Sequence, residues 1–369
     1  MEVIVLFVVA WLAFANGAND NFKGVATLYG SGSTSYRTAL AVATVATAAG
    51  SVLSIAIASG LIAAFSGSGL VSADVAASAG FTASVGGAAA ITILLATRLG
   101  MPTSTTHALT GALLGVAVAV DGAQSAWQPL VRGFFVPLLV SPLIAIALSA
   151  LAFALLARGR ARFGPGGPSC LCLARPVSEA PQTSGAACAV ASPSLVVAPV
   201  AECERTLDAG AVLARSDRIA ATAHLMSAAS VCFGRAVNDT PKVAALMATA
   251  TLAQGPWALG LVALAMAIGG LVASRRVAET ISHGITPLDP AQGLLANLVT
   301  SGLVIAASRY GLPVSTTHVS CGSIFGIGFA TRSARWRTIA QILAAWITTL
   351  PLAALLGGIL YMLADSTPR

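Results

Sequence analysis

Long apolar runs separated by short polar breaks make up most of the chain. A helix needs roughly 20 apolar residues to cross a bilayer, and about ten candidate windows can be drawn along this sequence. The runs lie near residues 3–16, 38–64, 76–97, 108–120, 130–157, 219–233, 243–273, 291–308, 319–330 and 338–364. This pattern predicts an all-α polytopic membrane protein with about 10–12 membrane segments.

The composition supports this prediction. Hydrophobic residues make up 56% of the 369 residues, charged residues make up only 9%, and the mean hydropathy is +0.85. We therefore expect a multi-pass integral protein of the cell (inner or plasma) membrane, surrounded by the lipid bilayer. The first run follows the acidic Glu2 and leads directly into a polar motif, so we interpret it as a retained helix and not as a signal peptide.

The net charge of +7 does not indicate a nucleic-acid partner, because the arginines lie in the connections between apolar runs. The positive-inside rule explains this distribution better. Arginines flank the polar segment 158–218 on both sides, which predicts that this segment is cytoplasmic. The expected organisation is a first membrane repeat at 1–157, a Pro-, Gly- and Cys-containing cytoplasmic linker at 158–218, and a second membrane repeat at 219–369.

The linker contains four of the six cysteines, Cys170, Cys172, Cys188 and Cys203. Their spacing matches no zinc site, and a cytoplasmic position argues against disulfide bonds. The linker is rich in Pro and Gly, which predicts flexibility. Its one short apolar piece, 192–201, is too short to span a membrane.

A polar motif follows the first apolar run and returns in the second half. Asn19, Asp20 and Lys23 form an Asn-Asp-x-x-Lys pattern that recurs at Asn238, Asp239 and Lys242, at an offset of 219 (238 minus 19). The chain contains only two lysines, and both occupy the same place in this motif. We therefore expect the motif to be functional.

A second motif is also duplicated. The stretch from Arg98 to His107 contains Pro102 followed by Ser-Thr-Thr-His, and it returns from Arg309 to His318 at an offset of 211 (309 minus 98). The two copies share nine identities over the eighteen positions from 98 to 115. Two motifs that recur in the same order indicate duplicated halves. If each half crosses the membrane an odd number of times, the repeats are inverted, as in many secondary transporters.

The proline in each copy predicts a broken or re-entrant helix, and the hydroxyls that follow lie at a new helix start. Free backbone N–H groups and hydroxyls at a helix start suit an oxyanion, and paired broken helices indicate a transporter's substrate site. The alternative is that Ser and Thr only cap the helices. The candidate anion-binding residues are Ser104, Thr105, Thr106, Ser315, Thr316 and Thr317. His107 and His318 are secondary candidates, either as ligands or proton relays or as structural partners.

Asp20 and Asp239 are carboxylates inside predicted membrane segments, where charge is costly and usually functional. Together with Asn19 and Asn238 they offer only oxygen ligands, which suits a hard cation such as Na⁺ or a proton carrier. The alternative is that each aspartate forms a structural ion pair with the lysine three residues later.

These motifs resemble the PiT family of inorganic phosphate transporters. The resemblance covers both membrane halves and leaves out the linker. It implies an inverted-repeat fold, commonly dimeric, that moves phosphate with Na⁺ or H⁺ as the coupling ion and uses no other cofactor. It also implies that the Asn-Asp residues serve cations and phosphate, and that the Ser-Thr-Thr residues line the phosphate site.

The chain departs from the family pattern at Lys23 and Lys242, where the family usually has small or apolar residues. We hypothesise that the two ammonium groups replace the coupling cations, since two aspartates and two lysines sum to zero charge. A second version has the lysines bind the anion directly. The sequence does not separate the two versions.

The leading prediction is a secondary transporter (symporter) of inorganic phosphate that works by alternating access. Sulfate or another tetrahedral oxyanion is the alternative cargo, because hydroxyls and amides bind both. An intramembrane hydrolase using Ser104 or Ser315 is disfavoured, since two equivalent copies indicate binding and not catalysis. An anion channel is also disfavoured, because carboxylates beside hydroxyl-rich half-helices suit a saturable site.

Overall fold

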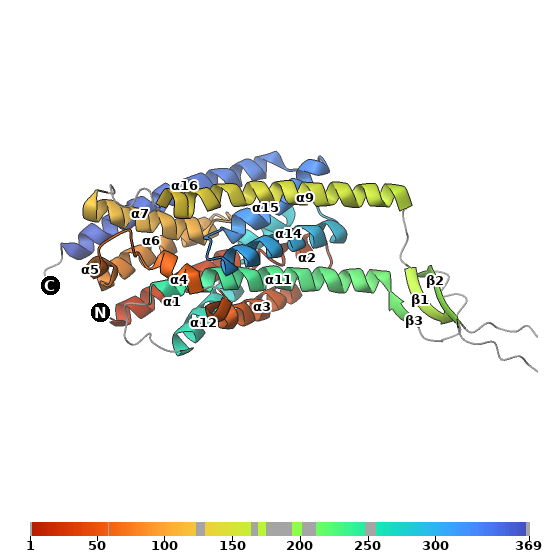
Figure 1. Cartoon of the computed structure of the whole chain (residues 1–369), viewed down its shortest axis with the longest axis horizontal. Helices are drawn as coiled ribbons and strands as arrows, with labels where there is room; N and C mark the ends of the chain where they lie inside the picture. Colours follow the sequence, from red (N-terminus) through yellow and green to blue (C-terminus); the bar gives the residue numbers. More distant parts are fainter. Residues whose placement is uncertain are drawn as a thin grey trace, which may run out of the picture. The chain divides into compact units, whose positions relative to one another are not determined.

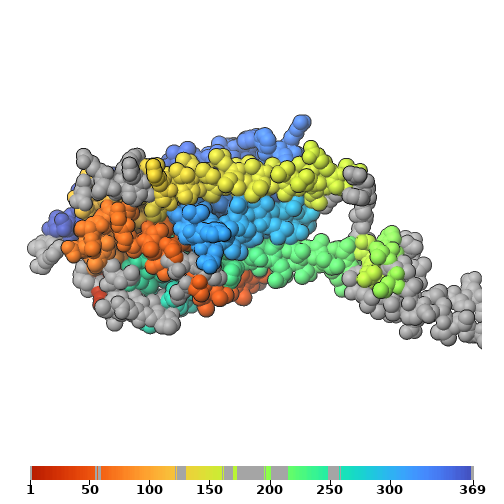
Figure 2. Space-filling view, in the orientation of Figure 1, coloured from red at the N-terminus to blue at the C-terminus, as the bar shows by residue number. Residues whose placement is uncertain are grey.

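The computed structural model describes residues 2–57, 59–122, 130–163, 169–174, 194–200, 212–247 and 256–366. It divides into two compact units: a membrane unit of residues 1–153 and 224–369, and a linker unit of residues 154–223. The membrane unit therefore contains both sequence halves. Figure 2 shows first-half residues, in orange and yellow, beside second-half residues, in green and blue, on one face of this unit.

Helices form nearly all of the membrane unit. Its first half contains α1 (Glu2–Asp20), α2 (Ala26–Gly30), α3 (Tyr36–Ile57), α4 (Ser59–Phe65), α5 (Ala73–Ala76), α6 (Ala79–Arg98), α7 (Thr105–Asp121), η1 (Val131–Phe135) and α9 (Val136–Phe163). Its second half contains α11 (Ser216–Ala245), α12 (Pro256–Ala273), α13 (Arg275–Glu279), η3 (Thr280–Gly284), α14 (Pro290–Arg309), α15 (Thr316–Ala330) and α16 (Trp336–Asp365). The predicted all-α membrane class is confirmed.

Six helices in the described part are long and apolar enough to cross a membrane, or up to seven spans if the bent pair α12 and α13–η3 is included. This number is lower than the predicted 10–12 segments. Helix α11 is 30 residues long but carries charged side chains at Arg235, Asp239 and Lys242, and α7 and α15 are shorter than 18 residues. Several membrane elements therefore lack the length or the composition of a simple span.

Two helical hairpins carry the duplicated Ser-Thr-Thr segments. Helix α6 packs against α7, and α14 packs against α15. Each hairpin turns at a glycine in the left-handed region, Gly100 with φ +70° and Gly311 with φ +67°, where a side chain would be strained. Each second helix then begins after the proline, as predicted. The hydroxyls of Ser104 and Ser315 cap these helices by accepting the backbone N–H groups of His107 and His318.

Helix α1 lies against α6 and α12, with α12 in turn against α3 (Figure 1). Two glycines allow α1 and α12 to approach each other closely. A Cβ at Gly17 would lie 1.9 Å from the carbonyl oxygen of Met266 on α12, and one at Gly269 would lie 2.0 Å from the carbonyl oxygen of Phe14. Small residues let membrane helices approach closely. This contact holds the end of α1, which carries the first Asn-Asp motif, against the second half.

The linker unit contains a three-stranded antiparallel sheet in the order β2-β1-β3, built from β1 (Ser169–Ala174), β2 (Ser194–Pro199) and β3 (Val212–Arg215). These strands were not predicted. The apolar piece of the linker forms β2 because a short Val-rich segment suits a strand. Cys170 is disulfide-bonded, which corrects the expectation that the linker has no disulfides. Cys188 and Cys203 lie outside the described residues.

Candidate functional site

Five charged side chains are buried together where the two sequence halves meet. Within the described residues they are the only Asp, Glu, Lys or Arg side chains that are buried, and each is at most 2% exposed. We call them the buried charge cluster: Asp20, Lys23, Arg235, Asp239 and Lys242. Charges this deep in a membrane protein are costly and usually mark the pathway of an ion or a substrate.

Lys23 connects both halves of the chain. It follows the end of α1, where Asn21 to Val25 form a turn, and its ammonium group pairs with Asp20. The same group donates to the Thr103 carbonyl oxygen at 2.7 Å and to the hydroxyl of Thr317. The Thr317 hydroxyl in turn donates to the Thr103 carbonyl oxygen at 2.6 Å. We call Asp20, Lys23, Thr103 and Thr317 the Lys23 arm.

Lys242 makes the same contacts with the halves exchanged. Its ammonium group lies 3.4 Å from Asp239 and donates to the Val314 carbonyl oxygen at 3.0 Å and to the Thr106 hydroxyl at 2.7 Å. The Thr106 hydroxyl donates to the Val314 carbonyl oxygen at 3.0 Å. We call Asp239, Lys242, Val314 and Thr106 the Lys242 arm. Each lysine therefore joins the aspartate of its own half to the Ser-Thr-Thr segment of the other half.

The two asparagines of the Asn-Asp motifs bind backbone groups in the non-helical segments before α7 and α15. Asn19 donates to the Met101 carbonyl oxygen at 3.1 Å and to the Thr97 hydroxyl at 2.9 Å, and it accepts from the Thr103 N–H at 3.0 Å. Asn238 donates to the Val314 carbonyl oxygen at 3.1 Å and to Asp239 Oδ1 at 3.0 Å, and it accepts from the Ser308 hydroxyl at 3.2 Å. Both asparagines thus bind the backbone at the breaks, and Asn238 also binds the aspartate that follows it.

Asn16 and Arg235 lie between the two arms. The Asn16 amide donates to Asp20 Oδ2 at 3.3 Å, to Asp239 Oδ2 at 3.2 Å and to the Thr105 hydroxyl at 2.9 Å. Arg235 Nη1 donates to Asn16 Oδ1 at 2.9 Å. The Thr105 hydroxyl also donates to Asp20 Oδ2 at 3.2 Å. One asparagine therefore joins both motif aspartates.

The predicted site residues thus gather in one place. The hydroxyls of Thr105, Thr106 and Thr317 contact the buried charge cluster, while Ser104 and Ser315 use their hydroxyls as helix caps. The sequence prediction missed Asn16 and Arg235. They stand at equivalent positions of the first motif, at the offset of 219 (235 minus 16), but they differ in identity. The sequence prediction relied on residues that are identical in the two halves, so it did not identify this pair.

The two histidines, each next to a threonine that binds a lysine, lie against each other. The rings of His107 and His318 have centroids 4.3 Å apart, and the His318 ring lies 3.7 Å from that of Trp346. Both histidines line an apolar recess of about 870 Å³ between α9 and α16. Trp346 Nε1 donates to the Pro102 carbonyl oxygen at 3.1 Å. This hydrogen bond connects α16, which forms one wall of the recess, to the non-helical segment before α7. Both histidines thus lie in the wall of this recess, next to the Ser-Thr-Thr segments.

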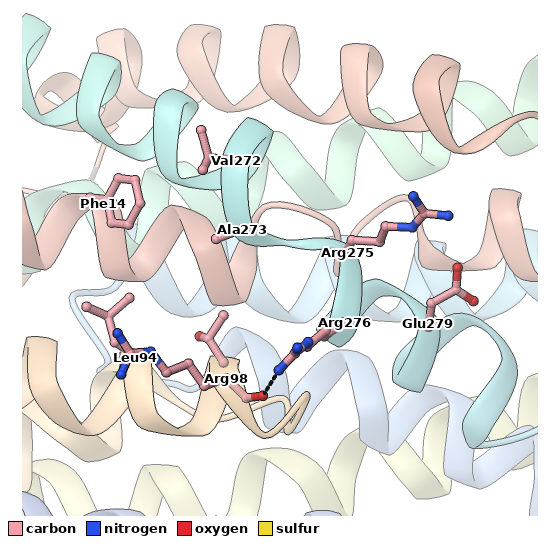
Figure 3. Close-up of a pocket in the computed structure, with 9 residues that line it drawn as sticks. Phe14, Leu94, Arg98, Val272, Ala273, Arg275, Arg276 and Glu279 are labelled. Atoms are coloured by element: carbon pink, nitrogen blue, oxygen red, sulfur yellow. Dashed lines mark hydrogen bonds between the residues drawn. The ribbon is translucent and has the colours of Figure 1, made fainter.

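A second recess, of about 860 Å³, lies between α1, α6, α12 and α13. Figure 3 shows Arg98 and Arg276 at its edge, where Arg276 Nη1 donates to the Arg98 carbonyl oxygen at 2.7 Å. Its wall includes Thr97, whose hydroxyl binds Asn19. Only the Thr97 side chain therefore connects this arginine-lined recess to Asn19 of the first Asn-Asp motif.

Comparison with known proteins identifies the family of this chain. A model of a family described as the phosphate transporter family matches residues 16–357. The chain belongs to this family. The match includes both copies of both motifs, so the arms described above lie within the matched region.

Individual relatives agree with this assignment. The chain is 26% identical to a probable low-affinity inorganic phosphate transporter of Mycobacterium bovis, over 97% of this chain and 77% of the relative. It is 34% identical to a probable low-affinity inorganic phosphate transporter of Rhizobium meliloti over 151 residues, which cover 38% of this chain and 45% of the relative. The family and these relatives are transporters and not enzymes.

A solved structure entitled the sodium-dependent phosphate transporter has a similar fold. It aligns with a TM-score of 0.75 over 100% of this chain and 99% of that chain, at 19% sequence identity. The chain therefore has the fold of that transporter, and its family and its long apolar helices make it an integral, multi-pass membrane protein.

Proposed function

We propose that this protein is a secondary transporter that moves inorganic phosphate across the cell membrane. The observation that carries the proposal is the exchange of contacts between the halves, in which each lysine joins the aspartate of one half to a threonine of the other. A site built in this way changes when one half moves against the other. The family and the names of its members support phosphate as the cargo.

Alternating access follows from two inverted repeats in this proposal. In Figure 1, α1 begins and α16 ends at the same end of the membrane unit. Helices α9 and α11 run in opposite directions between that end and the other, which supports an odd number of crossings in each half. Rocking of the halves about the buried charge cluster would then expose it to each side in turn.

The candidate phosphate ligands are the threonines of the two Ser-Thr-Thr segments together with the two lysines. Ammonium groups and hydroxyls are donors that bind phosphate oxygens. The protonated oxygens of phosphate can donate to Asp20 or Asp239, which sulfate at neutral pH does not do. This difference supports phosphate over sulfate as the cargo.

Na⁺ or H⁺ remains the expected coupling ion on family grounds, but both aspartates are already faced by an ammonium group. We propose that Lys23 and Lys242 stand where coupling cations would otherwise neutralise the carboxylates. On the same family grounds we propose a homodimer. The arginines that flank segment 158–218 support a cytoplasmic linker.

The experiment is uptake of labelled phosphate into proteoliposomes, with sulfate as competitor and with Na⁺ or N-methylglucamine outside. We expect saturable phosphate uptake that excess sulfate does not block and that Na⁺ changes little. Uptake of sulfate in place of phosphate would change the cargo, and flux that rises linearly with anion concentration would indicate a channel. An absolute Na⁺ requirement would contradict the role proposed for the lysines.

A further inference from the structure

The arginine-lined recess between α1, α6, α12 and α13 combines an apolar wall with basic side chains. The apolar lining residues are Phe14, Leu94, Val272 and Ala273. The basic lining residues are Arg98, Arg275 and Arg276. On α6 an arginine follows an apolar lining residue by four positions (98 minus 94), and the same spacing recurs where α12 bends into α13 (276 minus 272). Figure 3 shows Phe14 and Leu94 toward one end of the recess and the side chains of α13 toward the other.

The formal charge of the lining is positive. Glu279 is the one acidic residue of the lining, and its carboxylate is already engaged by other groups. Its Oε1 accepts from the Tyr29 hydroxyl at 3.0 Å, and its Oε2 lies 3.1 Å from His283 Nδ1. Among the described residues, none of the three lining arginines forms a salt bridge with a carboxylate. Three guanidinium groups are therefore available to an anion.

The recess opens on an apolar surface. Val272 lines it and is 73% exposed, and on α6 the neighbouring Leu95 and Leu99 are 46% and 67% exposed. In an integral membrane protein, apolar side chains that lie exposed on the outer surface of the helices face lipid tails. The anion that reaches these arginines is thus expected to come from the bilayer.

Aromatic side chains lie beside the basic end of the recess. The Arg275 guanidinium lies over the Tyr36 ring, 5.8 Å from its centroid, and the Tyr36 hydroxyl lies 3.2 Å from Ser274 Oγ at the bend. Tyrosines and arginines together are typical of the level of lipid headgroups. The basic end therefore suits a headgroup, and the apolar wall suits the chain attached to it.

We propose that the arginine-lined recess binds one anionic phospholipid, with its headgroup phosphate at the arginines and part of an acyl chain along the apolar wall. Arginine forks bind phosphate oxygens well, and a lipid also fills the apolar part of a recess of about 860 Å³, which a free phosphate ion does not. This site goes beyond the proposed transport of phosphate.

The position of the recess gives the bound lipid a structural role. Thr97 lines the recess and binds Asn19, and Arg276 Nη1 donates to the Arg98 carbonyl oxygen. A lipid in the recess lies against the end of α6 and contacts α1 and α13 as well. Its binding therefore stabilises the contacts that hold the end of α6 beside the first Asn-Asp motif.

The test is native mass spectrometry of the full-length protein in detergent, titrated with phosphatidylglycerol or with phosphatidylcholine of the same acyl chains. We expect one saturable phosphatidylglycerol adduct, with a Kd at least about tenfold lower than that for phosphatidylcholine. Inorganic phosphate in large excess should not displace it. Phosphatidylglycerol should also raise the melting temperature, because a ligand that binds only the folded state stabilises it.

Arginine variants assign the binding to the recess. Each arginine near a headgroup is worth about 1 kcal/mol, so Arg98→Gln should raise the Kd for phosphatidylglycerol about fivefold, and Arg98→Gln with Arg275→Gln about 25-fold. Binding of phosphatidylcholine should not change. Arg309→Gln is the matched control, since Arg309 is the exposed equivalent of Arg98 at the end of α14 and does not line the recess. It should bind phosphatidylglycerol like the wild type.

Three results would overturn the lipid site. They are equal affinity of the wild-type protein for the two lipids, adducts that accumulate without saturation, and displacement of phosphatidylglycerol by inorganic phosphate, which would assign the arginines to a free anion. These measurements use the wild-type protein and do not depend on the folding of a variant. They also do not depend on transport, so a protein that binds phosphatidylglycerol but takes up no phosphate would contradict the proposed function alone.

Discussion

The Lys23 arm and the Lys242 arm are built to the same plan but differ where they meet. Each has an aspartate, a lysine three residues later, a backbone carbonyl of its own half and a threonine of the other half. Between them the first half supplies the neutral Asn16 and the second half the charged Arg235. The comparison teaches that the duplicated parts balance charge, whereas the unequal pair sets the net charge of the site.

The largest effect is expected from removing the aspartates. Asp239→Asn leaves Lys242 and Arg235 without the carboxylate that both face, and Asp20→Asn leaves Lys23 unpaired. We expect either variant to lower phosphate uptake at least about 100-fold and to lose about 3–5 kcal/mol of stability, with Asp239→Asn the less stable. Uptake and thermal unfolding in detergent measure the two effects.

A double variant controls for misfolding. Asp20→Asn combined with Lys23→Met removes the whole buried pair, so the protein should regain stability but not transport. Transport by the double variant at the wild-type rate would show that the Lys23 arm is structural only.

Removing the lysines tests whether the arms are equivalent. Lys23→Met and Lys242→Met each leave one carboxylate without its ammonium partner. A cation from solution can then take its place, so we expect each variant to gain roughly tenfold stimulation by Na⁺. Uptake with Na⁺ and with N-methylglucamine measures this gain. If uptake and its Na⁺ dependence stay unchanged in the double variant lacking both lysines, the lysines do not replace coupling cations.

A smaller effect is expected at Thr105, whose hydroxyl links Asp20 to Asn16. Thr105→Val removes hydrogen bonds to a charged group, worth about 1.5–3 kcal/mol, and should lower kcat/KM about tenfold. Thr316→Val is the matched variant, since it changes the equivalent residue of the other Ser-Thr-Thr segment. A loss confined to Thr105→Val would sharpen the asymmetry between the halves, whereas equal losses would point to symmetric use of the two threonines.

The smallest effect is expected at the helix caps. Ser104→Ala and Ser315→Ala each remove a hydroxyl that accepts a backbone N–H, at a cost of about 1 kcal/mol. The two variants should lower the melting temperature equally and leave KM nearly unchanged. A large rise in KM without a change in melting temperature would instead mean that the serine hydroxyls bind the anion.

Hydropathy and repeated motifs were enough to predict the membrane class and the broken helices. The break at Pro102 and its copy at Pro313 follow from local backbone chemistry, so sequence alone places them before α7 and α15. The number of spans was harder to predict, because α11 carries buried charges that compensate one another only in the folded protein.

The contacts across the two arms could not be predicted from the sequence. The repeat indicated that Lys23 and Lys242 are equivalent, but not that each reaches the threonine of the other half. Arg235 was not recognised as a site residue, since an arginine beside an Asn-Asp motif has no repeated partner to mark it. Its burial depends on Asn16 and Thr47, which are far away in the sequence.

The contacts that Lys23 and Lys242 make between the two halves have a consequence for the proposed movement of those halves. Each buried ammonium group binds a threonine of the other half. Movement of one half away from the other would break these hydrogen bonds and leave a buried ammonium group short of an acceptor, which costs free energy. The empty protein would therefore keep its halves together at both lysines, and an anion that supplies new acceptor oxygens would lower the cost of separating them.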